Sequence, residues 1–236
     1  MGSRTIIGVS STAGDEATYL ARAAAALGTT SFAWFWDDLY PGSTNVPNGW
    51  ADQSTNGGTS DCGPLGGPNT LAGGVCRAST GTSANGTGSF RHVGGGFVNP
   101  GQRACWFGAK LRINTAMPAT TLGVAHLQDL GGSSTTAVGF IPALNSTNFI
   151  VQHSGTLAGS AINLGVALDT GWHVFEVKMG GANNTIWGRI DGGLWIPGTI
   201  TVPHLYAARI FTQVNTASTG VNRSVDFDWF GLATVR

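Results

Sequence analysis

The sequence predicts an all-β fold in which two sheets pack as a sandwich, and two observations support this prediction. Short runs of alternating apolar and polar residues recur along the 236-residue chain, and turn-forming stretches separate them. Glycine is abundant at 37 residues, and Thr, Ser and Asn fill most of the sequence between the apolar runs, a composition that favours strands and turns over helices. Many short strands at such spacing are typical of a sandwich or jelly roll.

The strand pattern is clearest in the C-terminal half of the chain. Alternation of apolar and polar residues marks Cys105–Ile113, Trp172–Met179 and Ser224–Leu232 as strands with one face in a core. Thr185–Ile190 follows the second of these after a Gly/Asn turn, so the two segments are predicted to form a hairpin. The segment Asp191–Gly193 then supplies another tight turn, because Asp tolerates the left-handed conformation of a primed turn and Gly adopts it freely.

The N-terminal part is predicted to be an arm, residues 1–45, ahead of a sandwich domain over residues 46–236 that is clearest from residue 102 onward. Acidic residues open Asp15–Gly28, alanines fill it and a glycine ends it, which predicts a short helix. Its alanine-rich face is weakly apolar, so we expect it to dock on a neighbouring surface, as an attachment element or as a lid over one end of the sandwich. Residues 42–74 are rich in Gly, Asn and Pro and predict a long loop or several short strands.

Five segments follow one another in the order that a known superfamily has them. They are a strand at Phe107–Ile113, an apolar Gly139–Ile141, a Trp-His strand at Gly171–Val177, a hairpin end at Arg189–Gly193 and a last strand at Val225–Phe230. This order resembles the concanavalin A-like lectin/glucanase sandwich, in which a Trp-His strand, a Val-Asp-Gly hairpin and an Asp-x-Val/Phe strand recur. The resemblance spans residues 100–236 and implies a concanavalin-like jelly-roll β-sandwich.

The chain also resembles virion proteins of bacteriophages, chiefly capsid decoration proteins and tail fibre or receptor-binding domains. Its Gly/Thr/Ala-rich composition carries this resemblance, together with a start, Met1–Ile7, that has no apolar core of signal-peptide length. The resemblance implies a head-stabilising or adhesive decoration protein on the particle exterior, assembled in the host cytoplasm. A tail fibre or other carbohydrate-binding module for host surface glycans is the alternative, and a degenerate or unrecognised glycan hydrolase or lyase is a third hypothesis.

The charge of the chain limits its partners. Its formal net charge is zero, and only 10% of its residues are Asp, Glu, Lys or Arg, against roughly 25% in an average soluble domain. Nucleic acid is not expected as a partner, because neutralising phosphates needs clustered Lys and Arg. No stretch approaches the length of an apolar membrane span. So few charges predict a surface that faces another protein; the alternative is a polar surface rich in Ser, Thr and Asn that stays soluble without charge. The resemblance to virion proteins implies that these partners are copies of this chain and the major capsid protein or tail proteins.

No catalytic, cofactor-binding or metal-binding residue is predicted. Glycosidases of the resembled superfamily place paired carboxylates on one strand face, whereas the two glutamates of this chain, Glu16 and Glu176, lie far apart. Asp226 and Asp228 share a spacing that would suit an acid and a base, but they are expected to be solvent-facing or hydrogen-bonded. The period of two places His173 on the same apolar face as Phe175 and Val177, which predicts a hydrogen-bonded core histidine and not a ligand-facing one.

In the last strand, Val225, Phe227 and Trp229 are expected to face the core and the two aspartates between them to face away.

The eight tryptophans raise the possibility of carbohydrate binding, because sugars stack their apolar faces on exposed indoles. Six of them are too many for the core, namely Trp34, Trp36, Trp50, Trp106, Trp187 and Trp195. The favoured interpretation is burial under loops or at subunit contacts, where aromatic residues are also enriched. The alternative is a glycan site, for which Trp106 and Trp195 are the indoles to test.

Three cysteines without CxxC spacing favour neither a zinc site nor a full disulfide framework. Cys62 and Cys76 flank a Gly/Pro-rich loop and could pair with each other. Free, buried thiols are expected instead at both positions and at Cys105, because the predicted compartment is reducing.

Overall fold

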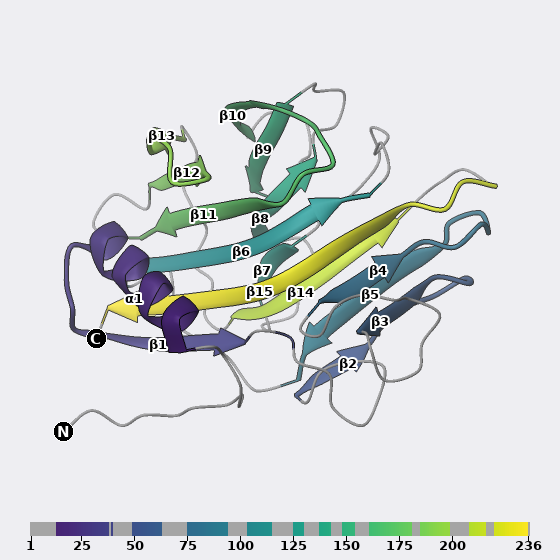
Figure 1. Cartoon of the computed structure of the whole chain (residues 1–236), viewed down its shortest axis with the longest axis horizontal. Helices are drawn as coiled ribbons and strands as arrows, with labels where there is room; N and C mark the ends of the chain where they lie inside the picture. The colour runs from purple at the N-terminus through teal and green to yellow at the C-terminus, as the bar shows by residue number, and fades with distance from the viewer. Residues whose placement is uncertain are drawn as a thin grey trace.

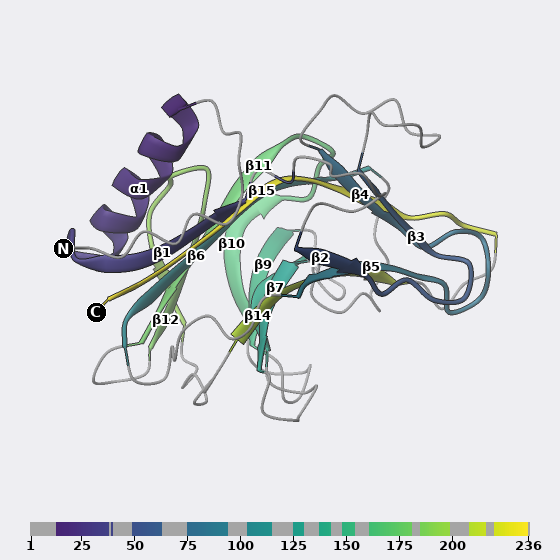
Figure 2. The same cartoon turned by 90° about the horizontal axis from the view of Figure 1, so that it is seen from below.

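The chain forms a sandwich of two antiparallel sheets with one helix on its outside, as the computed structural model in Figures 1 and 2 shows. This confirms the predicted all-β, concanavalin-like architecture. The structure describes residues 13–37, 39, 49–62, 75–93, 103–114, 125–129, 137–142, 148–153, 161–180, 185–198, 208–215 and 220–235.

The first sheet has eight strands in the order β13-β12-β11-β6-β15-β4-β3, and β1 also pairs with β15. Its strands are β1 (Phe32–Asp37), β3 (Thr59–Cys62), β4 (Cys76–Ser79), β6 (Cys105–Ile113), β11 (His173–Met179), β12 (Ile186–Ile190), β13 (Ile196–Pro197) and β15 (Ser224–Val235). The second sheet has seven strands in the order β10-β9-β8-β7-β14-β5-β2. Its strands are β2 (Trp50–Asp52), β5 (Thr87–His92), β7 (Ala125–Asp129), β8 (Ala137–Pro142), β9 (Asn148–His153), β10 (Ala161–Ala167) and β14 (Ala208–Asn215).

The core lies between the two sheets and is rich in phenylalanine. Phe107 of the first sheet stacks on Phe140 of the second with ring centroids 5.3 Å apart, and Phe140 in turn contacts Phe175 at 5.3 Å. Phe149 meets the edge of Phe175 at 5.1 Å. Such offset and edge-to-face pairs stabilise a core beyond the area that they bury.

The predicted hairpin is confirmed, because β11 pairs with β12 over the register Phe175↔Ile190 to Met179↔Ile186. The tight turn that follows is also confirmed. Asp191 and Gly192 both have positive φ, at 51° and 72°, and the amide of Gly193 donates to the carbonyl of Ile190. Two successive positive φ values define the primed turn that matches strand twist.

The helix α1 (Ala13–Leu27) is confirmed where the sequence predicts it, and Gly28 ends it at a φ of 67°. The helix packs on the outer face of the eight-stranded sheet, across β6 and β15, on the side away from the second sheet (Figures 1 and 2). Its apolar face contacts Trp106 and Trp229. The helix therefore covers a sheet face, and the expectation of a lid over one end of the sandwich is wrong.

The last strand departs from simple alternation. A register shift between Phe227 and Trp229 inserts Asp228 as an extra residue opposite β6, which is a β-bulge. After the bulge, Phe230 takes the place in the core next to Phe227, while Trp229 lies on the outer face beneath the helix. The expectation that Trp229 faces the core with Val225 and Phe227 is therefore wrong, because one extra residue exchanges the two faces of a strand.

The N-terminal segment is built into the first sheet. β1, which falls within the arm predicted over residues 1–45, pairs with β15 along its whole length. Residues 42–74 contain the short strands β2 and β3, in agreement with one of the two alternatives for this stretch. The rest of this stretch lies largely outside the described residues.

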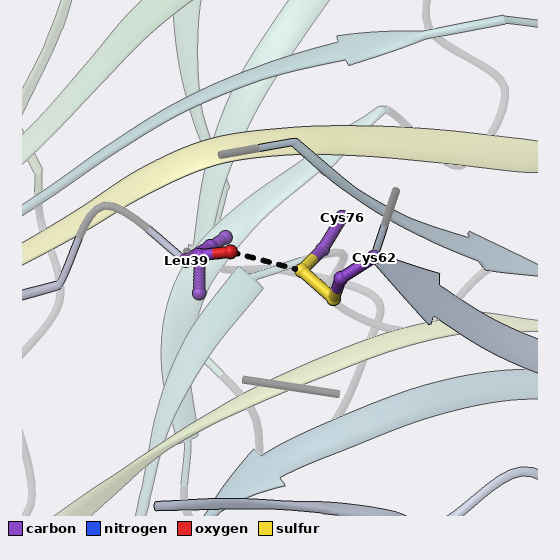
Figure 3. Close-up of a disulfide and its surroundings, with 3 residues drawn as sticks. All are labelled: Leu39, Cys62 and Cys76. Carbon is purple, nitrogen blue, oxygen red and sulfur yellow. Dashed lines mark hydrogen bonds between the residues drawn. A yellow bond between two sulfur atoms is a disulfide. The ribbon is translucent and has the colours of Figure 1, made fainter. Parts of the chain in front are cut away.

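A disulfide joins Cys62 of β3 to Cys76 of β4 (Figure 3). The two residues are register partners in adjacent antiparallel strands, with Cα atoms 4.0 Å apart, and both are buried. The Cys76 sulfur lies 3.7 Å from the carbonyl oxygen of Leu39, a contact without a thiol hydrogen because this sulfur is bonded to Cys62. The expectation of free thiols at these two positions is therefore wrong, because strand pairing brings them together, whereas Cys105 is a buried free thiol as expected.

Candidate functional site on the outer face of the eight-stranded sheet

A buried carboxylate organises this face. Glu176 points from β11 away from the core, toward the helix, and its side chain is 0% exposed. Arg189 of β12 binds both of its oxygens, at 2.7 Å each, and the indole nitrogen of Trp106 donates to one of them at 3.1 Å. Arg22 of the helix reaches the other oxygen at 3.2 Å. Since four donors saturate this carboxylate, it holds the helix to the sheet and is not placed for acid–base chemistry.

The two aspartates of β15 are also held in ion pairs. Asp226 is 0% exposed, and it accepts two hydrogen bonds from Arg77, at 2.6 and 3.0 Å, and one from Arg112 at 2.9 Å. Asp228, at the bulge, pairs with Lys110 and is partly exposed. The expectation that these residues are hydrogen-bonded or solvent-facing is therefore confirmed.

A cluster of two indoles and two cations lies at the β11–β12 end of this face. The Lys178 ammonium lies 5.0 Å from the ring centroid of Trp187 and 4.9 Å from that of Trp195. The Arg189 guanidinium lies 4.3 Å from the centroid of Trp195. All four side chains are half-buried. We call these four residues the indole–cation patch; cation–π attraction holds its rings in place on a rigid sheet.

Strand pairing and the tight turn assemble the patch. Lys178 and Trp187 are register partners across β11 and β12, so their side chains share a face. The turn at Asp191–Gly192 reverses the chain, and β13 then pairs with β12, which returns Trp195 over the cations. Leu194, beside Trp195, is 89% exposed.

A third half-buried indole lies on the same face. Lys110 and Arg112 approach the ring centroid of Trp172 at 5.5 and 4.8 Å. Both of these cations also pair with aspartates of β15, so their charges are compensated locally.

Of the remaining tryptophans whose side chains the structure describes, Trp50, Trp106 and Trp229 are buried. Trp50 belongs to the core between the sheets, and Trp106, only 2% exposed, lies under the helix with Trp229. Trp34 packs half-buried against the same cluster, and the side chain of Trp36 lies outside the described residues. The hypothesis of Trp106 as a sugar-binding indole is therefore wrong, because the helix covers it. Trp106 is buried, as the favoured interpretation expects, but under the helix and not under a loop or at a subunit contact.

A small apolar cleft separates the helix from the sheet, lined in part by Tyr19, Trp34 and Trp106. Its free volume of about 10 Å³ leaves room for a water molecule at most. The cleft is therefore no site for a sugar.

His173 lies between two aspartates at the start of β11. One ring nitrogen is 2.6 Å from an oxygen of Asp191 and the other is 2.9 Å from an oxygen of Asp169, while Phe149 packs on the ring at 4.9 Å. Burial lowers the pKa of His173, but the hydrogen bonds to the two aspartates outweigh it and raise the pKa above its usual 6.5. The hydrogen bond between His173 and Asp169 also lowers the pKa of Asp169. The prediction of a hydrogen-bonded histidine is therefore confirmed.

The hydrogen bonds of His173 to Asp169 and Asp191, which we call the Asp169–His173–Asp191 clasp, predict that the stability of the fold depends on pH. Folding raises the pKa of His173, so the protonated ring stabilises the folded chain. This contribution to the free energy of unfolding is fully present below pH 6.5 and is lost as the pH rises through the raised pKa. We expect urea denaturation to show a larger fall in unfolding free energy between about pH 5.5 and about pH 9 for the native chain than for His173→Gln. The difference should be ~1 kcal/mol or less, because both aspartates are about half exposed. Equal pH dependence of the two proteins would contradict this interpretation.

The described part of the chain offers no group of three or more His, Cys, Asp and Glu side chains that could hold a metal ion. In the Asp169–His173–Asp191 clasp the carboxylates bind opposite nitrogens of one ring and so do not converge on one point. Among the same described residues, no helix has the length and apolar character needed to cross a membrane.

Comparisons with known proteins were made at the level of sequence and of structure. No family model matches the chain, and no curated protein matches it. Among solved structures, the acidic lectin of winged bean in complex with methyl-α-D-galactose superposes with a TM-score of 0.59 at 9% identity, covering 87% of this chain and 100% of the lectin.

Two bacterial and phage structures are also similar. A protein of unknown function from Shewanella oneidensis MR-1 has a TM-score of 0.54 at 18% identity, covering 98% of this chain and 96% of its own. A carbohydrate esterase from the Shiga toxin-encoding bacteriophage phi24B has a TM-score of 0.52 at 17% identity, covering 80% of this chain and 91% of the esterase chain. Identities this low demonstrate a common fold and nothing finer. The chain therefore has the concanavalin A-like β-sandwich fold of the legume lectins.

Proposed function

We propose that this chain is a non-catalytic, glycan-binding protein on the exterior of a bacteriophage particle. The observation that carries the proposal is the indole–cation patch, in which Trp187 and Trp195 are half-buried on the outside of the sandwich.

The geometry of the patch suits a sugar ring. A pyranose presents an apolar face of C–H groups, which packs against an aromatic ring. Lys178 and Arg189 hold Trp195 in place, and both cations rise from paired strands, so little side-chain freedom remains to be lost on binding. A preformed platform of this kind binds without reorganising the sheet.

Three observations support a location on a particle exterior. One of the similar structures is a carbohydrate esterase from a bacteriophage. The buried Cys62–Cys76 disulfide suits a protein that works outside a reducing cytosol. The low content of charged residues suits a surface that contacts other subunits.

The test is binding to an array of bacterial surface polysaccharides, followed by calorimetric titration with an oligosaccharide of the strongest ligand. Trp195→Ala is expected to weaken binding roughly tenfold, the loss that corresponds to one aromatic stacking contact. Trp172→Ala is the matched control, because it removes another half-buried, cation-flanked indole of the same face outside the patch. Unchanged binding by Trp195→Ala, or an equal loss in the control, would contradict the assignment of the site.

A capsid decoration role is the second candidate, and the exposed Leu194 beside the patch favours it, because large exposed apolar side chains occur at subunit contacts. In this role the chain assembles with copies of itself or with the major capsid protein. Sedimentation of the purified chain as a discrete oligomer, dispersed by Leu194→Ser, would support this candidate. A strictly monomeric chain that does not label isolated particles in electron microscopy would exclude it.

A further inference from the structure

The charges around the indole–cation patch do not balance. Arg22 and Arg189 pair with a single carboxylate, that of Glu176, while Lys178 lies over Trp195, the indole that Arg189 also approaches. Glu176 is buried and receives hydrogen bonds from both arginines, and it forms no ion pair with Lys178. Among the described side chains of this cluster, three cations therefore stand against one carboxylate.

Lys178 differs in this respect from the other cations of the face. Arg22 and Arg189 pair with Glu176, Arg77 and Arg112 pair with Asp226, and Lys110 pairs with Asp228. Among the residues that the structure describes, Lys178 is the cation of this group that has no carboxylate within ion-pair distance. Its ammonium group lies against two indole rings instead.

We infer that the saccharide bound at the patch is acidic and that its carboxylate or sulfate group pairs with Lys178 while its ring stacks on Trp195. This inference rests on the proposed glycan-binding function and adds the chemical class of the ligand. An anion placed beside Lys178 gains an ion pair at a site where the half-buried side chain is already partly desolvated, which strengthens the attraction. A neutral sugar stacks on the same ring and gains no such pair.

The experiment titrates the chain with paired probes that differ only in charge. Oligogalacturonate is compared with its methyl ester, and a sulfated galactan oligosaccharide with its desulfated form, at low and at high ionic strength. The acidic member of the bound pair is expected to bind about fivefold more tightly at low salt, and the preference should shrink at high salt.

Lys178→Met is the decisive variant, because it keeps an apolar stem against the two indoles and removes the charge. It should abolish the preference for the acidic member, so that the two members of a pair bind with equal affinity. Lys110→Met is the matched control, since Lys110 also approaches an indole but is paired with Asp228, and it should leave the preference intact.

The possible outcomes separate the two proposals. If the neutral member binds as tightly as the acidic one, or the preference survives in Lys178→Met, the inference is wrong while the glycan-binding function stands. If neither member of any pair binds and the array of bacterial surface polysaccharides yields only neutral ligands, the inference is wrong while the glycan-binding function stands. If the array yields no ligand either, the proposed function is wrong and the inference falls with it.

Discussion

Replacing Glu176 with Gln is expected to lower the free energy of unfolding by about 3–5 kcal/mol, the usual cost of removing one partner from a buried ion pair. The carboxylate is 0% exposed and receives hydrogen bonds from Arg189, Arg22 and Trp106. The amide of Gln carries no negative charge to balance the two arginines. Its NH2 group is a hydrogen-bond donor and would face the N–H donors of the arginines or of Trp106. The two guanidinium groups are then left without a counter-charge.

Urea denaturation followed by circular dichroism measures this loss, and hydrogen exchange locates it. Because Arg22 is the charged link from the helix to the sheet, we expect the amides of α1 to lose protection in Glu176→Gln before those of the core strands. Asp228→Asn is the control, since Asp228 is partly exposed and has Lys110 as its ion-pair partner, and it should cost about 1 kcal/mol or less. A loss for Glu176→Gln no larger than that of the control would show that the buried cluster does not stabilise the fold.

Removing the disulfide by the double substitution Cys62→Ala and Cys76→Ala is expected to lower the free energy of unfolding by about 3 kcal/mol. The bridge closes a segment with a sequence separation of 14 residues, and a loop of this length restricts the unfolded chain by about that amount. Guanidinium denaturation with and without a reductant measures the effect, and the double variant should be insensitive to the reductant.

Thiol counting gives an independent check on the disulfide. Burial raises the pKa of the Cys105 thiol, so this residue should not react with a thiol reagent in the folded chain. After denaturation without reductant, one reactive thiol is expected from the three cysteines of the sequence. Three reactive thiols would show that the bridge is absent.

Much of the fold could be predicted because its signals are local. The period of two in β6 and β11, the primed turn at Asp191–Gly192 and the end of α1 at Gly28 each depend on neighbouring residues, and the structure confirms all of them. The order of these segments also indicated the concanavalin-like sandwich, which the comparison with lectin structures bears out.

The candidate site was only partly predictable. Of the two indoles that the sequence offers for testing, Trp195 lies in the patch and Trp106 is covered by the helix. Successive residues of a strand face opposite sides, so Trp106 lies opposite the core residue Phe107, but this period does not show what covers the outer face of a sheet. The sequence predicts the hairpin between β11 and β12, but its register, which pairs Lys178 with Trp187, is seen only in the structure.

The strands β6, β11, β12 and β15, the turn at Asp191–Gly192 and the helix could be predicted from the sequence, because they depend on side-chain period and backbone preference over a few residues. The tertiary structure alone decided how the outer face is used. Arg22 meets Glu176 across 154 residues, Cys62 meets Cys76 through strand pairing, and one bulged residue turns Trp229 from the core to the helix. Each of these results depends on packing between distant segments, whose geometry no local pattern encodes.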